Sequence, residues 1–177
     1  MNDETPSSNP IQITLPNIHR LLGLGWGVLA LLLAVTFLLP NFSMATLQLN
    51  GIDVIRMTFK DTDSLRKIFD DSSFFLMVGV PIMYLLLAMV LGFAAVMRIM
   101  GKMSWLPMPV TITAIVTTVI TVIGIFVIGD DARDVPFLGK LMPKPIWGYH
   151  AALIWQGFAA TLGILHLMMN RRTSAQA

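Results

Sequence analysis

Residues 74–97 read FFLMVGVPIMYLLLAMVLGFAAVM, an apolar run without a charged side chain. A helix rises 1.5 Å per residue, so about 20 apolar residues cover the roughly 30 Å hydrocarbon core of a bilayer. Three further runs have the same character, at 21–39, 105–128 and 146–169, and none contains Asp, Glu, Lys or Arg. The pattern predicts an all-α membrane protein that folds as a four-transmembrane-helix bundle.

The composition of the 177-residue chain agrees with this class. Hydrophobic residues make up 55% and charged residues only 12%, and the mean hydropathy is +0.74, whereas soluble domains carry about 25% charged residues. A formal net charge of +2 without a basic run gives no indication of nucleic-acid binding. The absence of Cys excludes disulfides, thiolate zinc sites and thiol catalysis. We expect the first run to remain a span, because its 19 residues exceed the roughly 7–15 of a signal-peptide core.

The segments outside the runs divide the chain into a polar tail (1–18), one membrane domain (19–170) and a C-terminal tail (171–177). Two external loops, 40–73 and 129–145, are expected to cap one end of the bundle. In the first loop, residues 46–50 (TLQLN) alternate polar and apolar side chains, which is typical of a strand. Asn50-Gly51 is a turn signal, and residues 52–60 fit either the return strand of a hairpin or a short helix capped by Asp53. Residues 61–71 are expected to form a short amphipathic helix.

The basic residues favour an orientation with both termini in the cytoplasm. Seven Lys and Arg lie in the two external loops, so a raw count opposes this orientation. The charges that directly flank the spans on the other side are harder to translocate, and they decide our expectation: Arg20, Arg98, Lys102, Arg171 and Arg172.

Small and polar residues form a stripe on each of the four spans, and such stripes let helices approach closely in lipid. In the second span the stripe comprises Pro81, Ala88, Gly92 and Ala95. The other stripes comprise Gly23, Gly27, Ala30 and Ala34 in the first span, Thr113, Thr117, Thr121 and Gly124 in the third, and Gly148, Ala152, Gln156, Ala159, Gly163, His166 and Asn170 in the fourth. We expect the first and fourth spans to pack through Gly23/Gly27 and Ala159/Gly163. The alternative use of the first stripe is a homodimer. Gln156 near mid-membrane is expected to bond to the third-span threonines, since an unpaired amide is costly there.

Two residue groups are candidates for a bound cofactor or metal. His19 and His166 would lie at one membrane surface, so a bis-histidine haem between them is conceivable, although interfacial histidines explain them more simply. Asp130, Asp131 and Asp134 have the DDxxD spacing of carboxylates that hold Mg²⁺-diphosphate in prenyl-transferring enzymes. A single such motif, with Arg133 inside it, is more typical of a solvated loop. We therefore expect no cofactor and no catalytic residue.

The function expected from these observations is non-enzymatic. The chain reads as a small structural, accessory or assembly protein of the inner (plasma) membrane, whose partners are the lipid bilayer and other membrane subunits or itself. Two alternatives remain open at this point: a haem- or quinone-binding redox subunit, and a small channel or permease. Against an ion-coupled carrier, no span holds an Asp, Glu, Lys or Arg, and such residues within spans mark transport pathways.

Overall fold

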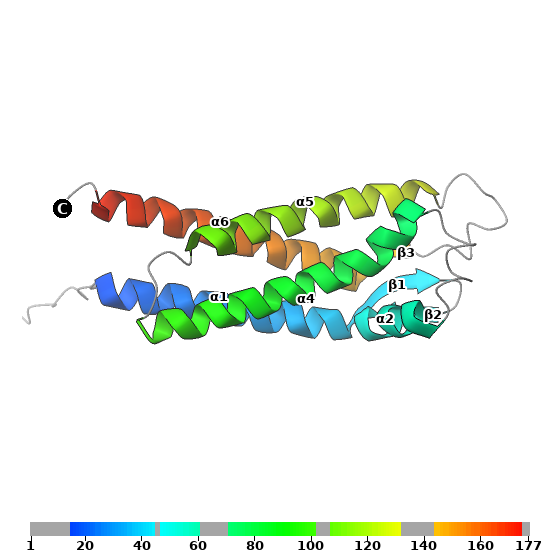
Figure 1. The fold of residues 1–177 in the computed structure, drawn as a ribbon, viewed down its shortest axis with the longest axis horizontal. Helices are drawn as coiled ribbons and strands as arrows, with labels where there is room; N and C mark the ends of the chain where they lie inside the picture. The colour runs from blue at the N-terminus through cyan, green and yellow to red at the C-terminus, as the bar shows by residue number, and fades with distance from the viewer. Residues whose placement is uncertain (1–14, 45–46, 61–70, 102–106, 132–143, 175–177) are drawn as a thin grey trace, which may run out of the picture.

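Four long helices make up most of the structure, a computed structural model that describes residues 15–44, 47–60, 71–101, 107–131 and 144–174. They lie side by side along one axis (Figure 1) and are α1 (Leu15–Leu38), α4 (Asp71–Ile99), α5 (Pro107–Asp131) and α6 (Trp147–Ser174). Each is long and apolar enough to cross a membrane, which confirms the prediction of four apolar helices. The helix ends differ from those of the apolar runs, because helical hydrogen bonding continues into polar flanks such as residues 170–174.

The glycine stripe of α1 packs against α4. A Cβ built on Gly27 would lie 3.6 Å from the Ala95 Cβ, and one on Gly23 would lie 3.3 Å from the Arg98 Cβ. The prediction that this stripe meets α6 is therefore wrong. The reason is that α4 offers its own small residues at matching heights, so these two antiparallel helices approach most closely. The two glycines are used inside the chain, which removes the basis for a homodimer through them.

The α1–α4 pairing predicts that two cysteines introduced at facing positions will form a disulfide, and the chain has no native cysteine to compete. The 3.6 Å separation at Gly27 and Ala95 falls within the roughly 3.5–4.5 Å Cβ–Cβ range of a disulfide. The Gly27→Cys/Ala95→Cys double variant should cross-link under mild oxidation, which a gel-mobility shift reversed by reductant would report. The matched pair Gly27→Cys/Ala159→Cys should stay reduced. Cross-linking only in the second pair would restore the α1–α6 pairing.

A small antiparallel sheet lies at the end of the long helices away from the start of α1 (Figure 1). Its strands are β1 (Pro40–Met44), β2 (Leu47–Asn50) and β3 (Lys144–Pro145), in the order β2-β1-β3. The strand predicted at 46–50 is present, but its hairpin partner is β1, which precedes it. The third strand, β3, comes from the second loop. It has only two residues, one of them a proline, so no sequence pattern predicted it.

The chain turns into a helix, α2 (Gly51–Lys60), immediately after β2. The turn predicted at Asn50-Gly51 is thus wrong, and of the two alternatives for 52–60 the helix is correct. Asn50 is its cap: the Asp53 amide donates to Asn50 Oδ1 at 2.9 Å, and the Asn50 amide donates to Asp53 Oδ2 at 3.3 Å. This reciprocal pair satisfies two donors that a helix start otherwise leaves free. The amphipathic helix predicted at 61–71 lies almost wholly outside the described residues.

Buried Asn41 joins the sheet to the long helices. Its Nδ2 donates to the carbonyls of Leu39 at 2.8 Å and Thr36 at 3.3 Å, which closes the end of α1. The backbone carbonyl of Asn41 accepts a hydrogen bond from the Ile146 amide at 2.9 Å, just before α6 begins. A Cβ on Gly148 would collide with the Pro40 carbonyl, so only glycine allows α6 to start this close to β1. These bonds hold the start of α6 beside the end of α1.

Candidate functional site

The predicted stripe of α6 faces the interior, and part of it packs against α5. Ala152, Gln156 and Ala159 are buried, and a Cβ on Gly163 would collide with the Thr111 side chain. At the outer end, the Tyr149 hydroxyl donates to the Thr121 carbonyl at 3.1 Å and fills the space that Gly124 leaves. The stripe was predicted correctly as a packing face, and at Gly163 it meets the third span rather than the first.

A polar cluster of three residues lies inside the end where α6 finishes: Trp26 of α1, Arg98 of α4 and His166 of α6. Arg98 Nη2 lies 2.6 Å from His166 Nε2, and the Trp26 ring centroid lies 5.1 Å from that of His166. Trp26 and His166 have no exposed surface. The burial of His166 agrees with its place on the predicted inward stripe of the fourth span, and the prediction that it lies at the depth of the membrane surface stays a prediction.

The chemistry of the pair follows from its donors. A guanidinium has only N–H donors, so the bond requires His166 Nε2 to accept and the imidazole to be neutral, with its proton on Nδ1. Nε2 is the nitrogen that a haem iron would have to take, and Arg98 already occupies it. The side chain of His19, the other residue of that hypothesis, lies outside the described part of the structure. The described geometry of His166 therefore fits a helix-to-helix link better than an axial ligand.

We expect purified protein to show no Soret absorption, because iron would have to displace the Arg98–His166 bond. The measurement is an absorption spectrum of protein prepared in mild detergent with haem supplied during expression. The control variant is His166→Ala, which should give the same spectrum. A Soret band in the native chain that His166→Ala abolishes would contradict this expectation and support a redox subunit.

Gln156 lies buried in the middle of α6 without a hydrogen bond from either end of its amide to any described residue. Its predicted partners on α5 are engaged elsewhere: Thr117 donates to the Ala114 carbonyl at 3.0 Å, Thr121 to the Thr117 carbonyl at 2.8 Å, and Thr113 to the Pro109 carbonyl at 2.8 Å. The predicted Gln156–threonine bond is therefore wrong. A threonine hydroxyl in a helix reaches the carbonyl of the residue three or four positions earlier without any rearrangement, and these local bonds take its proton.

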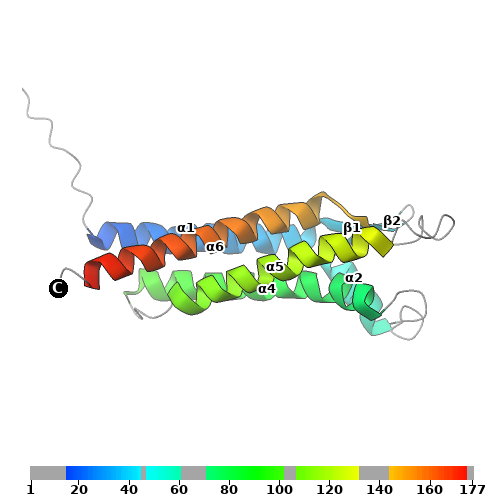
Figure 2. The ribbon, with the colours of Figure 1, turned by 90° about the horizontal axis from the view of Figure 1, so that it is seen from above.

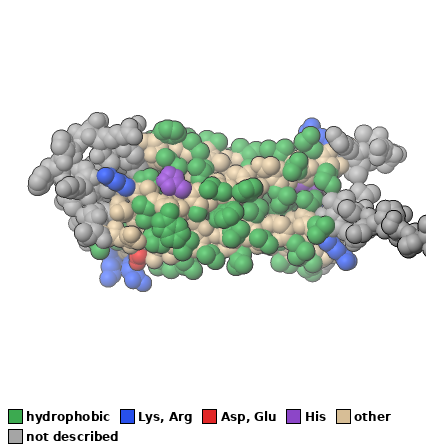
Figure 3. Space-filling view, turned by 180° about the vertical axis from the view of Figure 1, so that it is seen from behind, with side chains coloured by type: hydrophobic (Ala, Val, Ile, Leu, Met, Phe, Trp, Pro, Cys, Tyr) green, Lys and Arg blue, Asp and Glu red, His purple; other side chains and the backbone are tan. Residues whose placement is uncertain are grey.

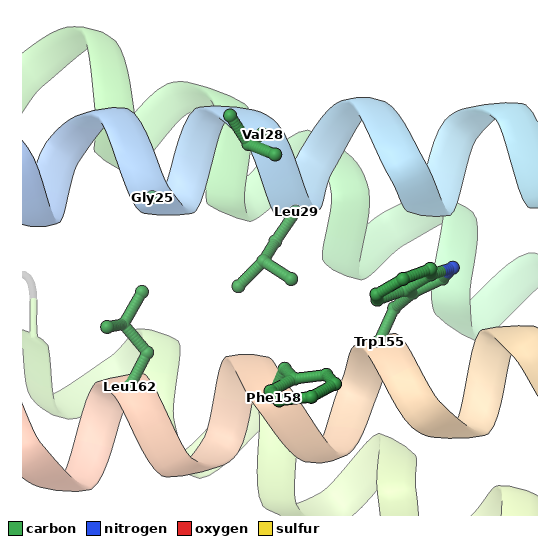
Figure 4. Close-up of a pocket in the computed structure, with 6 residues that line it drawn as sticks. All are labelled: Gly25, Val28, Leu29, Trp155, Phe158 and Leu162. Atoms are coloured by element: carbon green, nitrogen blue, oxygen red, sulfur yellow. The ribbon is translucent and has the colours of Figure 1, made fainter.

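A shallow groove lies between α1 and α6 (Figure 4). Its volume is about 390 Å³, and its lining is almost wholly apolar. Trp155 and Phe158 of α6 form one wall, with ring centroids 6.0 Å apart. Leu162 lies further along the same helix, and the α1 side is formed by Gly25, Val28 and Leu29.

The acidic motif is only partly described. Asp130 and Asp131 belong to the last turn of α5, while Asp134 lies beyond the described residues. Within the part of the chain that the structure describes, no group of three or more His, Asp or Glu side chains is placed to hold a metal ion. The candidate metal residues thus remain a prediction from the sequence.

Sequence reasoning missed the inward position of Arg98, and helical phase could have found it. Arg98 lies on the same helical stripe as Leu91 and Ala95, which are buried, so its side chain starts from the inner face of α4. Trp26 carried no such signal beyond its place beside the glycines.

Comparisons of the chain with protein-family models, curated proteins and solved structures find no match.

Proposed function

We propose that the four long helices form a transmembrane bundle, and that the protein is a non-catalytic accessory or assembly protein that holds a partner's transmembrane helix in the α1–α6 groove. The groove carries this proposal. A shallow apolar groove between two helices can receive the ridge of side chains of a third helix. Gly25 provides a floor without a side chain, and such positions allow close backbone approach in lipid.

The groove lining also favours a helix as its occupant. Trp155 and Phe158 present two adjacent ring surfaces, and aromatic side chains are the most common energetic anchors of protein interfaces. A helix can cover both rings and the α1 wall together with one face. On the face of the molecule in Figure 3, hydrophobic side chains occupy the surface between Lys and Arg side chains near the two ends, and we assign this surface to lipid.

Site-specific photo-cross-linking in native membranes tests the proposal. A photoreactive residue at Val28, in the groove, should give a discrete protein adduct of defined mass. The same residue at Val119, which is exposed on α5 and outside the groove, is the matched control and should give only lipid adducts. Lipid adducts alone from both positions would contradict a partner helix and leave the groove as a lipid contact.

We further propose an inner-membrane location with both termini cytoplasmic. The start of α1 and the end of α6 lie at the same end of the structure (Figure 1), and Arg20 and Arg171 are exposed there. Flanking cations of this kind favour the cytoplasmic side. A reporter active only outside the cytosol should give signal when inserted after Asp63 and none when fused after Asn170. The reverse pattern would invert the orientation.

A further inference from the structure

The exposed side of α2 carries the most exposed large apolar side chain of the described residues. Phe59 is 85% exposed and Ile52, seven residues earlier on the same face, is 42% exposed. The opposite side of α2 is buried through Gly51 and Val54 against the ends of α1 and α4. Exposed apolar side chains that share one face mark a site of contact with protein or membrane more often than isolated ones do.

The position and charge of α2 indicate what covers it. Figure 2 shows α2 beside the first turns of α4, with its far end projecting sideways from the long helices. In the transmembrane bundle proposed above, on which this inference rests, the apolar segment of α4 begins at Phe74, and this places α2 at the depth where headgroups meet the hydrocarbon. Arg56 and Lys60 are exposed next to Phe59. The acidic Asp53 is engaged in capping the helix start.

We propose that α2 is an interfacial anchor on the sheet side of the membrane. In this arrangement Phe59 and Ile52 enter the boundary between headgroups and acyl chains, and Arg56 and Lys60 bind lipid phosphates. A short helix with aromatic and aliphatic residues beside cations is typical of segments that lie in this boundary. The anchor fixes the height of the sheet at the bilayer surface, and it does not depend on any partner in the α1–α6 groove.

Spin labelling tests the anchor, since a single cysteine in this chain takes a unique nitroxide. Labels at Phe59→Cys, Gln48→Cys and Val119→Cys are compared in vesicles of phosphatidylcholine with phosphatidylglycerol. Gln48 on β2 is exposed and serves as the aqueous control, and Val119 on α5 serves as the lipid control. The measurement is the collision rate of each label with oxygen, which concentrates in lipid, and with a water-soluble nickel chelate.

The oxygen-to-nickel ratio at position 59 should be severalfold above that at 48 and below that at 119. A ratio equal to that at 48 would overturn the anchor, and so would a label at 59 shielded from both reagents, because protein would then cover it. Adding Arg56→Gln and Lys60→Gln should lower the ratio at 59 only in vesicles that contain phosphatidylglycerol. The matched Lys144→Gln change, on β3, should not. Equal effects of the two changes would overturn the phosphate contact.

Discussion

Replacing Gly163 by leucine is expected to lower the free energy of unfolding by about 1–3 kcal/mol, the usual cost of overpacking a closely packed core. A Cβ at this position already collides with the Thr111 side chain and lies 3.2 Å from the Thr111 Cα. The obstacle includes backbone, so α5 as a whole must move. The measurement is thermal or denaturant unfolding of the purified variant in mild detergent.

Gly157 provides the matched control on the same helix. A Cβ at Gly157 meets nothing within 4 Å, so Gly157→Leu should stay within about 0.5 kcal/mol of the native chain, as surface substitutions do. A harmful Gly157→Leu beside a neutral Gly163→Leu would mean that the inner and outer faces of α6 are reversed.

Replacing Gln156 by leucine is expected to stabilise the protein, by about 1–3 kcal/mol, because it removes a buried amide that lacks partners. Gln156 is 0% exposed, and neither amide atom makes a hydrogen bond within the described residues. Leucine has nearly the same volume and fits the apolar surroundings. Gln156→Glu should have the opposite effect, because it buries a titratable carboxyl in the same place.

Unfolding of the two variants, measured side by side, decides the point. If Gln156→Leu were destabilising by more than about 1 kcal/mol, the amide would have a hydrogen bond in the native membrane worth that much. The account of α6 as a stripe that serves packing alone would then fail at its centre.

The four helices could be predicted because long apolar runs have so few alternative structures. A span must satisfy every backbone group internally, so an apolar run of about 20 residues leaves few structures other than a helix. The inward faces also followed from the 3.6-residue period, and Ala152, Ala159 and Gly163 are buried as that period predicts.

Which helices meet could not be predicted in the same way. A stripe of small residues says that a helix has a close-packing face, but several helices here carry one, and nothing in a single sequence pairs them. Gly27 meets Ala95 rather than Ala159 because both α1 and α4 have small residues at the same height. The predicted bond from Gln156 to α5 is absent for an energetic reason. The threonine hydroxyls of α5 donate to carbonyls of their own helix in place of bonding between helices.

The segment from β1 to α2 shows what local sequence patterns cannot predict. The alternation at 46–50 indicated a strand correctly, but Asn50-Gly51 was assigned to a turn when Asn50 in fact caps α2. Both uses exploit the same short polar side chain, and only the tertiary position of the following residues selects between them. The pairing of Ser43 with Lys144 joins segments a hundred residues apart, and no local signal encodes it.

The most direct test of the proposed function fills the groove without disturbing the core. A Cβ on Gly25 would meet only the flexible end of Leu162, at 3.1 Å, so Gly25→Leu should fold with little loss of stability. The measurement is the yield of the protein adduct formed by a photoreactive residue at Val28, in the native chain and in Gly25→Leu. We predict that the adduct is present in the native chain and lost in the variant, at an unchanged melting temperature. An adduct that persists at full yield with the groove filled would contradict the account.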